Sequence, residues 1–240
     1  MIEYSFALSI PVADQDCILN SVIYQDWLKS VADKFVIKAV RFDSVDYFSK
    51  KHVPLFIKLT ATATLPDGKP VHGIVLVRGN AVGVLVVLRC GGKPYLLLVD
   101  QPRFPIGETH SLEIPAGILD WSRDYRKVAL SELKEEALID ADDGELIDLT
   151  GFWHEAGVAG FAGSCGLLDE RIRLYAIERE VSEQELRALG DRTQEYMDEN
   201  EWIKTRVYPY EEAAHKFIDG KNLIALFMYE RWLRAQGRTL

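Results

Sequence analysis

Cysteine is scarce in this chain of 240 residues. Only Cys17, Cys90 and Cys165 are present, an odd number at widely separated positions. Such a set provides neither a disulfide framework nor a cysteine-based zinc site. The five histidines also share no spacing typical of metal ligands. We therefore expect a protein of the reducing cytoplasm that does not depend on disulfides or zinc for its fold.

The chain also lacks a long hydrophobic run and an excess of positive charge. Its most apolar stretch, 74–88, contains Arg78 and Asn80 and is too short to span a membrane. The first 16 residues have no basic region before an apolar one, so no signal peptide is expected. The formal net charge of −9 argues against nucleic-acid binding, which needs clustered Lys and Arg. We expect neither membranes nor nucleic acids as partners.

What is present is a globular balance of 48% hydrophobic and 27% charged residues. Near the N-terminus, apolar residues at helical spacing predict a helix over 17–34. Alternating residues predict strands over 36–48 and 52–65, and the turn signal at 66–69 predicts that 55–65 and 71–77 form a hairpin. These elements predict a small β-rich domain over residues 1–78.

The remaining residues, 79–240, combine strand and helix patterns in one larger domain. The continuous apolar run at 81–89 predicts a strand that is covered on both faces. Further strands are predicted at 95–100, 145–153, 170–177 and 202–208, and residues 108–114 lead into the most informative stretch. Helices are predicted at 182–189, where Ser182 and Glu185 form a capping box, and at 210–220 and 222–235. Polar residues predict a loop at 193–200, and the mixture places the domain in the α/β class.

The most informative stretch runs from residue 113 to residue 139, EIPAGILDWSRDYRKVALSELKEEALI. Glu132, Glu135 and Glu136 stand at i, i+3 and i+4, so a helix would carry all three on one face. Carboxylates in such positions repel one another by roughly a few tenths of a kcal/mol per pair. Together they suit a hard divalent cation such as Mg²⁺, which takes oxygen ligands. The alternative is an ordinary solvated helix face.

The same stretch resembles the Nudix hydrolase signature, G-x5-E-x7-R-E-U-x-E-E-x-G-U, in which U is apolar. Three positions depart from it: Arg123 replaces the first Glu, Ser131 the Arg, and Leu138 the late Gly. The preceding QPRFPIGETHSLEIPAG is similar to the lead-in of the ADP-ribose and ADP-sugar pyrophosphatase branch, above all to plant-type ADP-sugar diphosphatases. This likeness extends from about residue 44 to about residue 230. The matching positions of the signature are Gly117, Glu132, Leu133, Glu135, Glu136 and Ile139.

The resemblance implies a Nudix α/β/α sandwich for residues 79–240 and a homodimer formed through residues 1–78. It also implies hydrolysis of the pyrophosphate bond of an ADP-sugar, ADP-glucose or ADP-ribose, with Mg²⁺ or Mn²⁺. The products would be AMP and a sugar phosphate. Two alternatives remain: a weakened Nudix module that binds a nucleotide sugar without efficient turnover, and a fold used only for assembly. The retained glutamates favour the enzyme.

The resemblance further implies roles for individual acidic residues. Glu132 and Glu136 are the expected metal ligands, together with the backbone carbonyl of Ala116. Glu135 is either a third ligand or a partner of the other two. The branch takes its general base from a loop after the signature, where Glu201 matches best and Glu199 second best. The alternative for the last two is that they are solvated loop acids.

Three more residues are expected to contact the substrate. Arg103 carries a planar guanidinium that suits a phosphate, although a surface arginine without a role is the alternative. Glu113 is expected to bind a metal or a ribose hydroxyl, or to be a strand-end acid without a role. Glu170 follows the Gly-rich loop at 156–166, where this branch carries substrate-binding acids.

Overall fold

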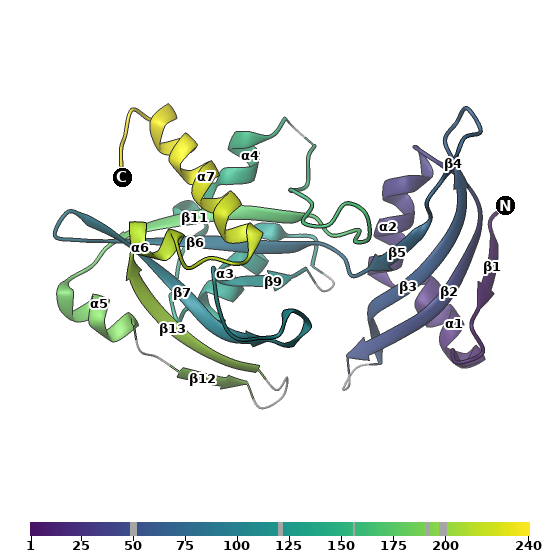
Figure 1. Ribbon diagram of the computed structural model, residues 1–240, viewed down its shortest axis with the longest axis horizontal. Coiled ribbons are helices and arrows are strands. Elements are labelled where there is room, and N and C mark those ends of the chain that lie inside the picture. Colours follow the sequence, from purple (N-terminus) through teal and green to yellow (C-terminus); the bar gives the residue numbers. More distant parts are fainter. Residues whose placement is uncertain (49–51, 120–121, 156, 191–192, 197–200) are drawn as a thin grey trace. The chain divides into compact units, whose positions relative to one another are not determined.

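The computed structural model describes residues 1–48, 52–119, 122–155, 157–190, 193–196 and 201–240. The chain forms two compact units, whose elements are labelled in Figure 1. The first contains Met1–Asn80 and Ala162–Arg171, and the second contains Ala81–Phe161 and Ile172–Leu240. Their boundary falls two residues after the expected one at 78. The segment 162–171, which was assigned to the larger domain, belongs to the first unit.

In the first unit, two helices pack on a β-sheet. The strands follow in the order β1 (Glu3–Phe6), β2 (Val36–Phe48), β3 (Val53–Thr64), β4 (Pro70–Val71) and β5 (Ile74–Val77), and the helices are α1 (Val12–Leu19) and α2 (Val22–Ala32). Tyr24 of α2 packs against Phe42 of β2 with ring centroids 5.1 Å apart. Strand β3 pairs with β4 and β5 across the turn, so the predicted hairpin is confirmed.

The helix predicted over 17–34 is wrong, because the structure has two helices that meet at Asn20 and Ser21. The Asn20 side-chain amide donates to the carbonyl of Asp16 at 2.7 Å, and the Ser21 hydroxyl donates to the carbonyl of Ile18 at 2.8 Å. These short polar side chains satisfy the last carbonyls of α1 and so compete with a continuous helix. Ser21 then has the extended backbone of an N-cap residue for α2.

The second unit is built on a sheet with the strand order β10-β11-β6-β7-β13-β12, to which β8 adds on β7 and β9 on β6. Its strands are β6 (Ala81–Cys90), β7 (Lys93–Arg103), β8 (Glu108–Glu113), β9 (Ala116–Ile118), β10 (Ile147–Asp148), β11 (Ile172–Glu180), β12 (Thr193–Tyr196) and β13 (Glu201–Pro209). Its helices are α3 (Tyr125–Glu135), α4 (Leu149–Trp153), α5 (Glu183–Leu189), α6 (Tyr210–Ala214) and α7 (Gly220–Ala235), with 3-10 turns η1 (Phe104–Ile106) and η2 (Asp143–Glu145).

Helices cover both faces of this sheet, which explains the continuous apolar run in β6. Val84 and its even-numbered neighbours pack with Leu133 of α3, whereas Leu85 and Val87 pack with Tyr229 of α7. Figure 1 shows α3 and α7 on the two opposite sides of β6 and β7. Each fully buried Val or Leu side chain stabilises the fold by about 1.5–3 kcal/mol. The predicted α/β/α sandwich is confirmed.

Two local predictions in this unit are wrong. Residues 145–153 were predicted as a strand, but they form η2, the short strand β10 and helix α4. The Asp148 carboxylate accepts the backbone N–H of Gly151 at 2.8 Å, and this cap starts a helix where the sequence predicted a strand. The predicted loop at 193–200 contains strand β12 at 193–196, and residues 197–200 lie outside the described residues.

The predicted capping box of α5 is confirmed. The Ser182 hydroxyl accepts the backbone N–H of Glu185 at 3.2 Å, and the Glu185 carboxylate accepts the backbone N–H of Ser182 at 2.7 Å. Among the helices that the structure describes, none combines the length and apolar character that a membrane span requires.

Candidate active site

Helix α3 begins and ends at residues that determine where its glutamates lie. The Asp124 carboxylate caps the helix by accepting the backbone N–H of Lys127 at 3.1 Å. Leu133 lies in the core beneath the helix and fixes which face turns outward. The helix ends before Leu138, which has a left-handed φ of 55°, and the backbone N–H of Ile139 donates to the carbonyl of Leu133 at 3.0 Å. A left-handed residue after the last turn is a common way to end a helix.

Glu136, just after the last residue of α3, is tied to the turn that precedes the helix in the chain. Its Oε2 accepts the backbone N–H of Ala116 at 2.9 Å, and the side chain is buried. Ala116 begins the short strand β9, which pairs with β6. The structure therefore brings together two of the residues expected to bind metal, although they are 20 positions apart in the chain.

Glu132 lies against the neighbouring residue, Gly117. A Cβ atom built on Gly117 would lie only 2.0 Å from Oε1 of Glu132. The backbone of Gly117 is not left-handed, so the requirement for glycine here is one of space. The turn at 116–117 consequently gathers the side chains of Glu132 and Glu136.

Glu135 has a different environment on the exposed side of α3. Its Oε1 accepts the hydroxyl of Ser131, one helical turn earlier, at 2.7 Å. Within the described part of the chain, no group of three or more His, Cys, Asp or Glu side chains is arranged to hold a metal ion. The structure thus brings together Glu132 and Glu136 at one turn, with Glu135 hydrogen-bonded along the helix.

Arg103 and Glu113, both expected to contact substrate, form an ion pair with each other. The guanidinium Nε and Nη2 of Arg103 donate to Oε1 and Oε2 of Glu113 at 2.7 and 2.8 Å. The Ser111 hydroxyl also donates to Oε1 at 2.9 Å, and Glu113 is only 1% exposed. Burial raises the pKa of Glu113, but the bonds and charges of Arg103 and Lys221 outweigh it and hold that pKa at about 2. Glu113 is therefore a carboxylate at neutral pH.

Sequence reasoning missed Lys221 and Asn222, which lie in the first turn of α7. The Lys221 ammonium donates to Glu113 and also to Asp219. The Asn222 side chain binds the backbone of β8 and of the residue that follows it. In the sequence these residues signal only the start of a helix, and nothing in their spacing indicates contact with a strand more than 100 positions away.

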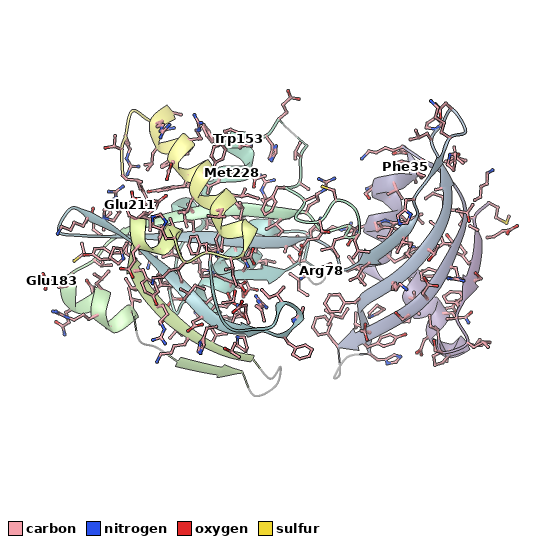
Figure 2. All side chains as sticks on the ribbon, in the orientation of Figure 1. Phe35, Arg78, Trp153, Glu183, Glu211 and Met228 are labelled. Carbon is pink, nitrogen blue, oxygen red and sulfur yellow. The ribbon has the colours of Figure 1, made fainter. Side chains whose placement is uncertain are left out.

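Glu170 belongs to the first unit, whereas the elements described above belong to the second. Its Oε1 is 3.2 Å from Nη1 of Arg78, a residue labelled in Figure 2. The adjacent Asp169 accepts the backbone N–H groups of Arg78 and Gly79 at 2.8 and 3.3 Å. These bonds join the segment 162–171 to the end of the N-terminal segment.

The two candidates for the general base lie at the edge of what the structure describes. Glu199 is outside the described residues. Glu201 is the first residue of β13, where its backbone pairs with Tyr196 of β12. The side chain of Glu201 is outside the described part, so its role stays a prediction.

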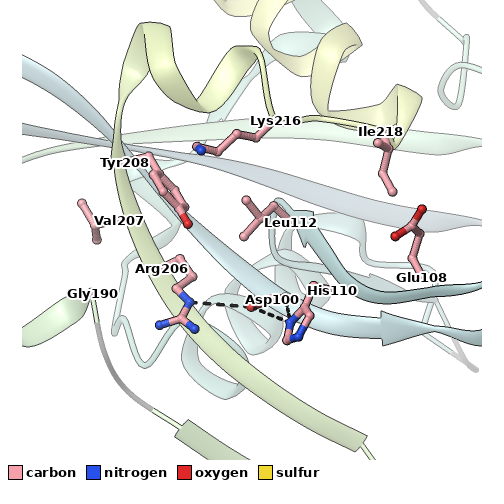
Figure 3. Close-up of a pocket in the computed structure, with 10 residues that line it drawn as sticks. All are labelled: Asp100, Glu108, His110, Leu112, Gly190, Arg206, Val207, Tyr208, Lys216 and Ile218. Atoms are coloured by element: carbon pink, nitrogen blue, oxygen red, sulfur yellow. Dashed lines mark hydrogen bonds and ion pairs between the residues drawn. The ribbon is translucent and has the colours of Figure 1, made fainter.

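A pocket of about 450 Å³ lies beside strands β7, β8 and β13 (Figure 3). The carboxylate of Asp100 is 3.3 Å from Nδ1 of His110 and 3.6 Å from Nε of Arg206. The Lys216 ammonium stands 5.0 Å from the centre of the Tyr208 ring. None of the residues expected to bind metal or substrate lines this pocket. Its lining is Asp100, Glu108, His110, Leu112, Gly190, Arg206, Val207, Tyr208, Lys216 and Ile218.

Comparison with known proteins agrees with this geometry. The NUDIX domain family model matches residues 77–227, more than half of the chain. The chain is 31% identical over 222 residues to Nudix hydrolase 14, chloroplastic, of Arabidopsis thaliana, covering 88% of this chain and 71% of that protein. It is 28% identical over 196 residues to an ADP-ribose pyrophosphatase of Bacillus subtilis (strain 168), covering 82% and 88%.

Among solved structures, an ADP compounds hydrolase has a similar fold, with a TM-score of 0.54. The two sequences are 19% identical, and the match covers 86% of this chain and 97% of the other. At that identity the likeness concerns the fold alone. The family match, the curated relatives and the glutamate-bearing helix together show that this chain belongs to the Nudix hydrolase family.

Proposed function

We propose that the chain hydrolyses the pyrophosphate bond of an ADP-sugar, ADP-ribose or ADP-glucose, to AMP and a sugar phosphate. The observation that carries this proposal is the turn at Ala116 and Gly117, which gathers Glu132 and Glu136. The printed name of a curated relative, ADP-ribose pyrophosphatase, supports the substrate class.

The residues of this turn fit a divalent cation, Mg²⁺ or Mn²⁺. The carboxylates of Glu132 and Glu136 and the carbonyl of Ala116 are hard oxygen donors. The absence of a Cβ on Gly117 leaves the space that the Glu132 carboxylate occupies. A bound cation would neutralise pyrophosphate charge and lower the pKa of water. Glu135, whose carboxylate accepts the hydroxyl of Ser131, is in this proposal a supporting partner of Glu132 and Glu136 and not a ligand itself.

The other side chains bind the substrate and move the proton. The bidentate pair with Glu113 fixes the plane of the Arg103 guanidinium, and 39% of the Arg103 side chain remains exposed toward a phosphate. A water oxygen attacks one phosphorus, the bridging P–O bond breaks, and one phosphate leaves with the bridging oxygen. Glu201, or Glu199 as the second candidate, accepts the proton of that water.

The test is a screen of nucleoside diphosphate derivatives with Mg²⁺ or Mn²⁺, with AMP measured by chromatography. Glu136→Gln is expected to lower kcat by at least about 100-fold, because it removes a ligand charge. Glu183→Gln is the matched control, since Glu183 lies on α5 and its carboxylate pairs with Arg187 at 3.5 Å. AMP release from no ADP-sugar with either metal would refute the proposal.

The second candidate is a Nudix module that binds a nucleotide sugar without efficient turnover. The altered signature positions Arg123, Ser131 and Leu138 are the reason to consider it. Binding of ADP-ribose in calorimetry without AMP release would support this alternative.

In either case we propose a cytoplasmic homodimer formed through residues 1–78. Sedimentation that detects only monomer at micromolar concentration would contradict the dimer.

A further inference from the structure

The first turn of α7 holds the segment that leads into the signature turn. Asn222 is completely buried, at 0% exposure. Its Oδ1 accepts the backbone N–H of Ile114 at 3.0 Å, and its Nδ2 donates to the carbonyl of Leu112 at 2.8 Å. One amide group thus binds the backbone on both sides of Glu113. Both polar ends of Asn222 are satisfied by backbone groups of this one segment.

Lys221, the residue before Asn222, binds the side chain of Glu113, which lies in the chain between Leu112 and Ile114. Its buried ammonium donates to Oε2 of Glu113 and, at 2.5 Å, to Oδ2 of Asp219. Asp219 is itself the N-cap of α7, where it accepts the backbone N–H of Lys221 at 2.8 Å. The start of the helix and the end of strand β8 are therefore joined by charge as well as by the Asn222 amide.

Hydrogen bonds also hold the next two residues, up to the turn at Ala116 and Gly117. The carbonyl of Pro115 accepts the backbone N–H of Val84 at 2.9 Å, and the N–H of Ala116 donates to Glu136 at 2.9 Å. Each residue from 112 to 116 is therefore held by a named partner. Asn222 supplies two of these bonds, and they end two residues before Ala116.

We infer that Asn222 is a positioning residue for the turn at Ala116 and Gly117, with Lys221 as its assistant. The inference rests on the proposed metal site. Without the Asn222 amide, the N–H of Ile114 and the carbonyl of Leu112 lose their partner, and the chain ahead of Ala116 can rotate. Residues that orient metal ligands typically contribute about 10- to 100-fold in metal affinity or activity. Asn222 therefore acts on the site from a helix that carries none of the expected ligands.

A purely structural role for Asn222 makes a different prediction, so a matched variant can separate the two. Leu233 is also buried on α7 and packs in the same core cluster as Ile114. It lies 11 residues after Asn222, about 16 Å along the helix axis at 1.5 Å per residue. Leu233→Ala should destabilise the fold without disturbing the segment at 112–116.

The experiment compares wild type, Asn222→Ala, Asn222→Asp and Leu233→Ala as full-length chains, below the Tm of each. Mn²⁺ binding is measured by electron paramagnetic resonance of the free ion, and kcat and KM by AMP release. Asn222→Ala should bind Mn²⁺ about 10- to 100-fold more weakly and lose kcat to a similar degree. Asn222→Asp keeps the acceptor for Ile114 but turns a carboxylate oxygen toward the carbonyl of Leu112, so it should lose at least as much as Asn222→Ala. Leu233→Ala should keep wild-type affinity and kcat.

Wild-type Mn²⁺ affinity in Asn222→Ala would overturn the inference, and so would an equal loss in Leu233→Ala. If the wild type binds Mn²⁺ but releases no AMP, the proposed function fails while the Mn²⁺ comparison still decides the role of Asn222. If the wild type releases AMP and Asn222→Ala does so equally well, the inference alone fails. A wild type that binds no Mn²⁺ would overturn both.

Discussion

Replacement of Gly117 by Ala should separate activity from stability. The new methyl carbon would lie 2.0 Å from Oε1 and 2.2 Å from Cδ of Glu132. Since Cβ contacts below 3.0 Å essentially do not occur, the carboxylate must move by at least 3.0 − 2.0 = 1.0 Å. That atom is the end of a flexible side chain, so the chain can fold around the change.

The two consequences differ greatly in size. An off-rotamer side chain costs about 0.5–1.5 kcal/mol. The reduced freedom of the unfolded chain after Gly→Ala returns about 0.4–1 kcal/mol. Tm should therefore change by no more than about 4 °C. A misplacement of about 1 Å at a reacting centre, however, can cost about 100-fold in rate.

The assay measures kcat/KM by AMP release, Mn²⁺ binding and Tm in parallel. Gly144→Ala is the control, because a Cβ at Gly144 meets nothing within 4 Å and its backbone is not left-handed. We expect Gly117→Ala to lose about 100-fold in kcat/KM and Gly144→Ala to lose none. Equal kcat/KM in the two variants, or wild-type metal binding in Gly117→Ala, would refute the placement of Glu132 at the turn.

Three further predictions concern the helix end, the base and the buried acid. A left-handed backbone costs an L-residue about 1–2 kcal/mol, which a change to glycine removes. Because glycine loses more conformational entropy on folding, about 0.5–1 kcal/mol of that gain is offset. Leu138→Gly, at a side chain 44% exposed, should therefore raise Tm by about 1–3 °C; an unchanged or lower Tm contradicts this. Glu201→Gln should lower kcat more than Glu199→Gln in steady-state kinetics, and the reverse order would exchange their roles. The pKa of Glu113 is lowered from 4.5 to about 2, so its stabilisation is present above pH 4.5 and lost as pH falls toward 2. Urea unfolding of Glu113→Gln should show a weaker loss of stability over that window than wild type.

Local patterns in the sequence predicted much of the fold. The apolar run of β6 follows from burial on both faces, and the α5 capping box follows from Ser182 and Glu185. Residues 145–153 were predicted as a strand, yet the cap from Asp148 to Gly151 starts a helix there. A hydrogen bond from a short polar side chain to the nearby backbone can determine the local structure where the hydrophobic pattern is weak.

The candidate site was predictable to a lesser degree. Helical spacing predicted only that the glutamates share one face of a helix, and the link from Glu132 and Glu136 to Ala116 came from the family resemblance; the structure does bring Glu136 to Ala116 and Glu132 to Gly117. Spacing alone also placed Glu135 beside them, but Ser131, one turn away, binds its carboxylate. Asn222 was out of reach because its bonds to β8 span 108 and 110 positions. Periodicity reports which face a residue occupies and contains no information on such distant partners.

The three altered signature positions have different local environments in the structure. Leu138 adopts the left-handed backbone that a glycine would adopt more easily, so this exchange costs stability at the helix end. Ser131 bonds Glu135 on the exposed face of α3, and Arg123 lines a groove with Tyr125, Arg126 and Arg173. Neither the bond from Ala116 to Glu136 nor the approach of Glu132 to Gly117 involves any of the three. The departures therefore change the ends and the outer face of the helix, while Glu132 and Glu136, which we propose as metal ligands, lie at the turn. This distribution favours the hydrolase over a module that only binds.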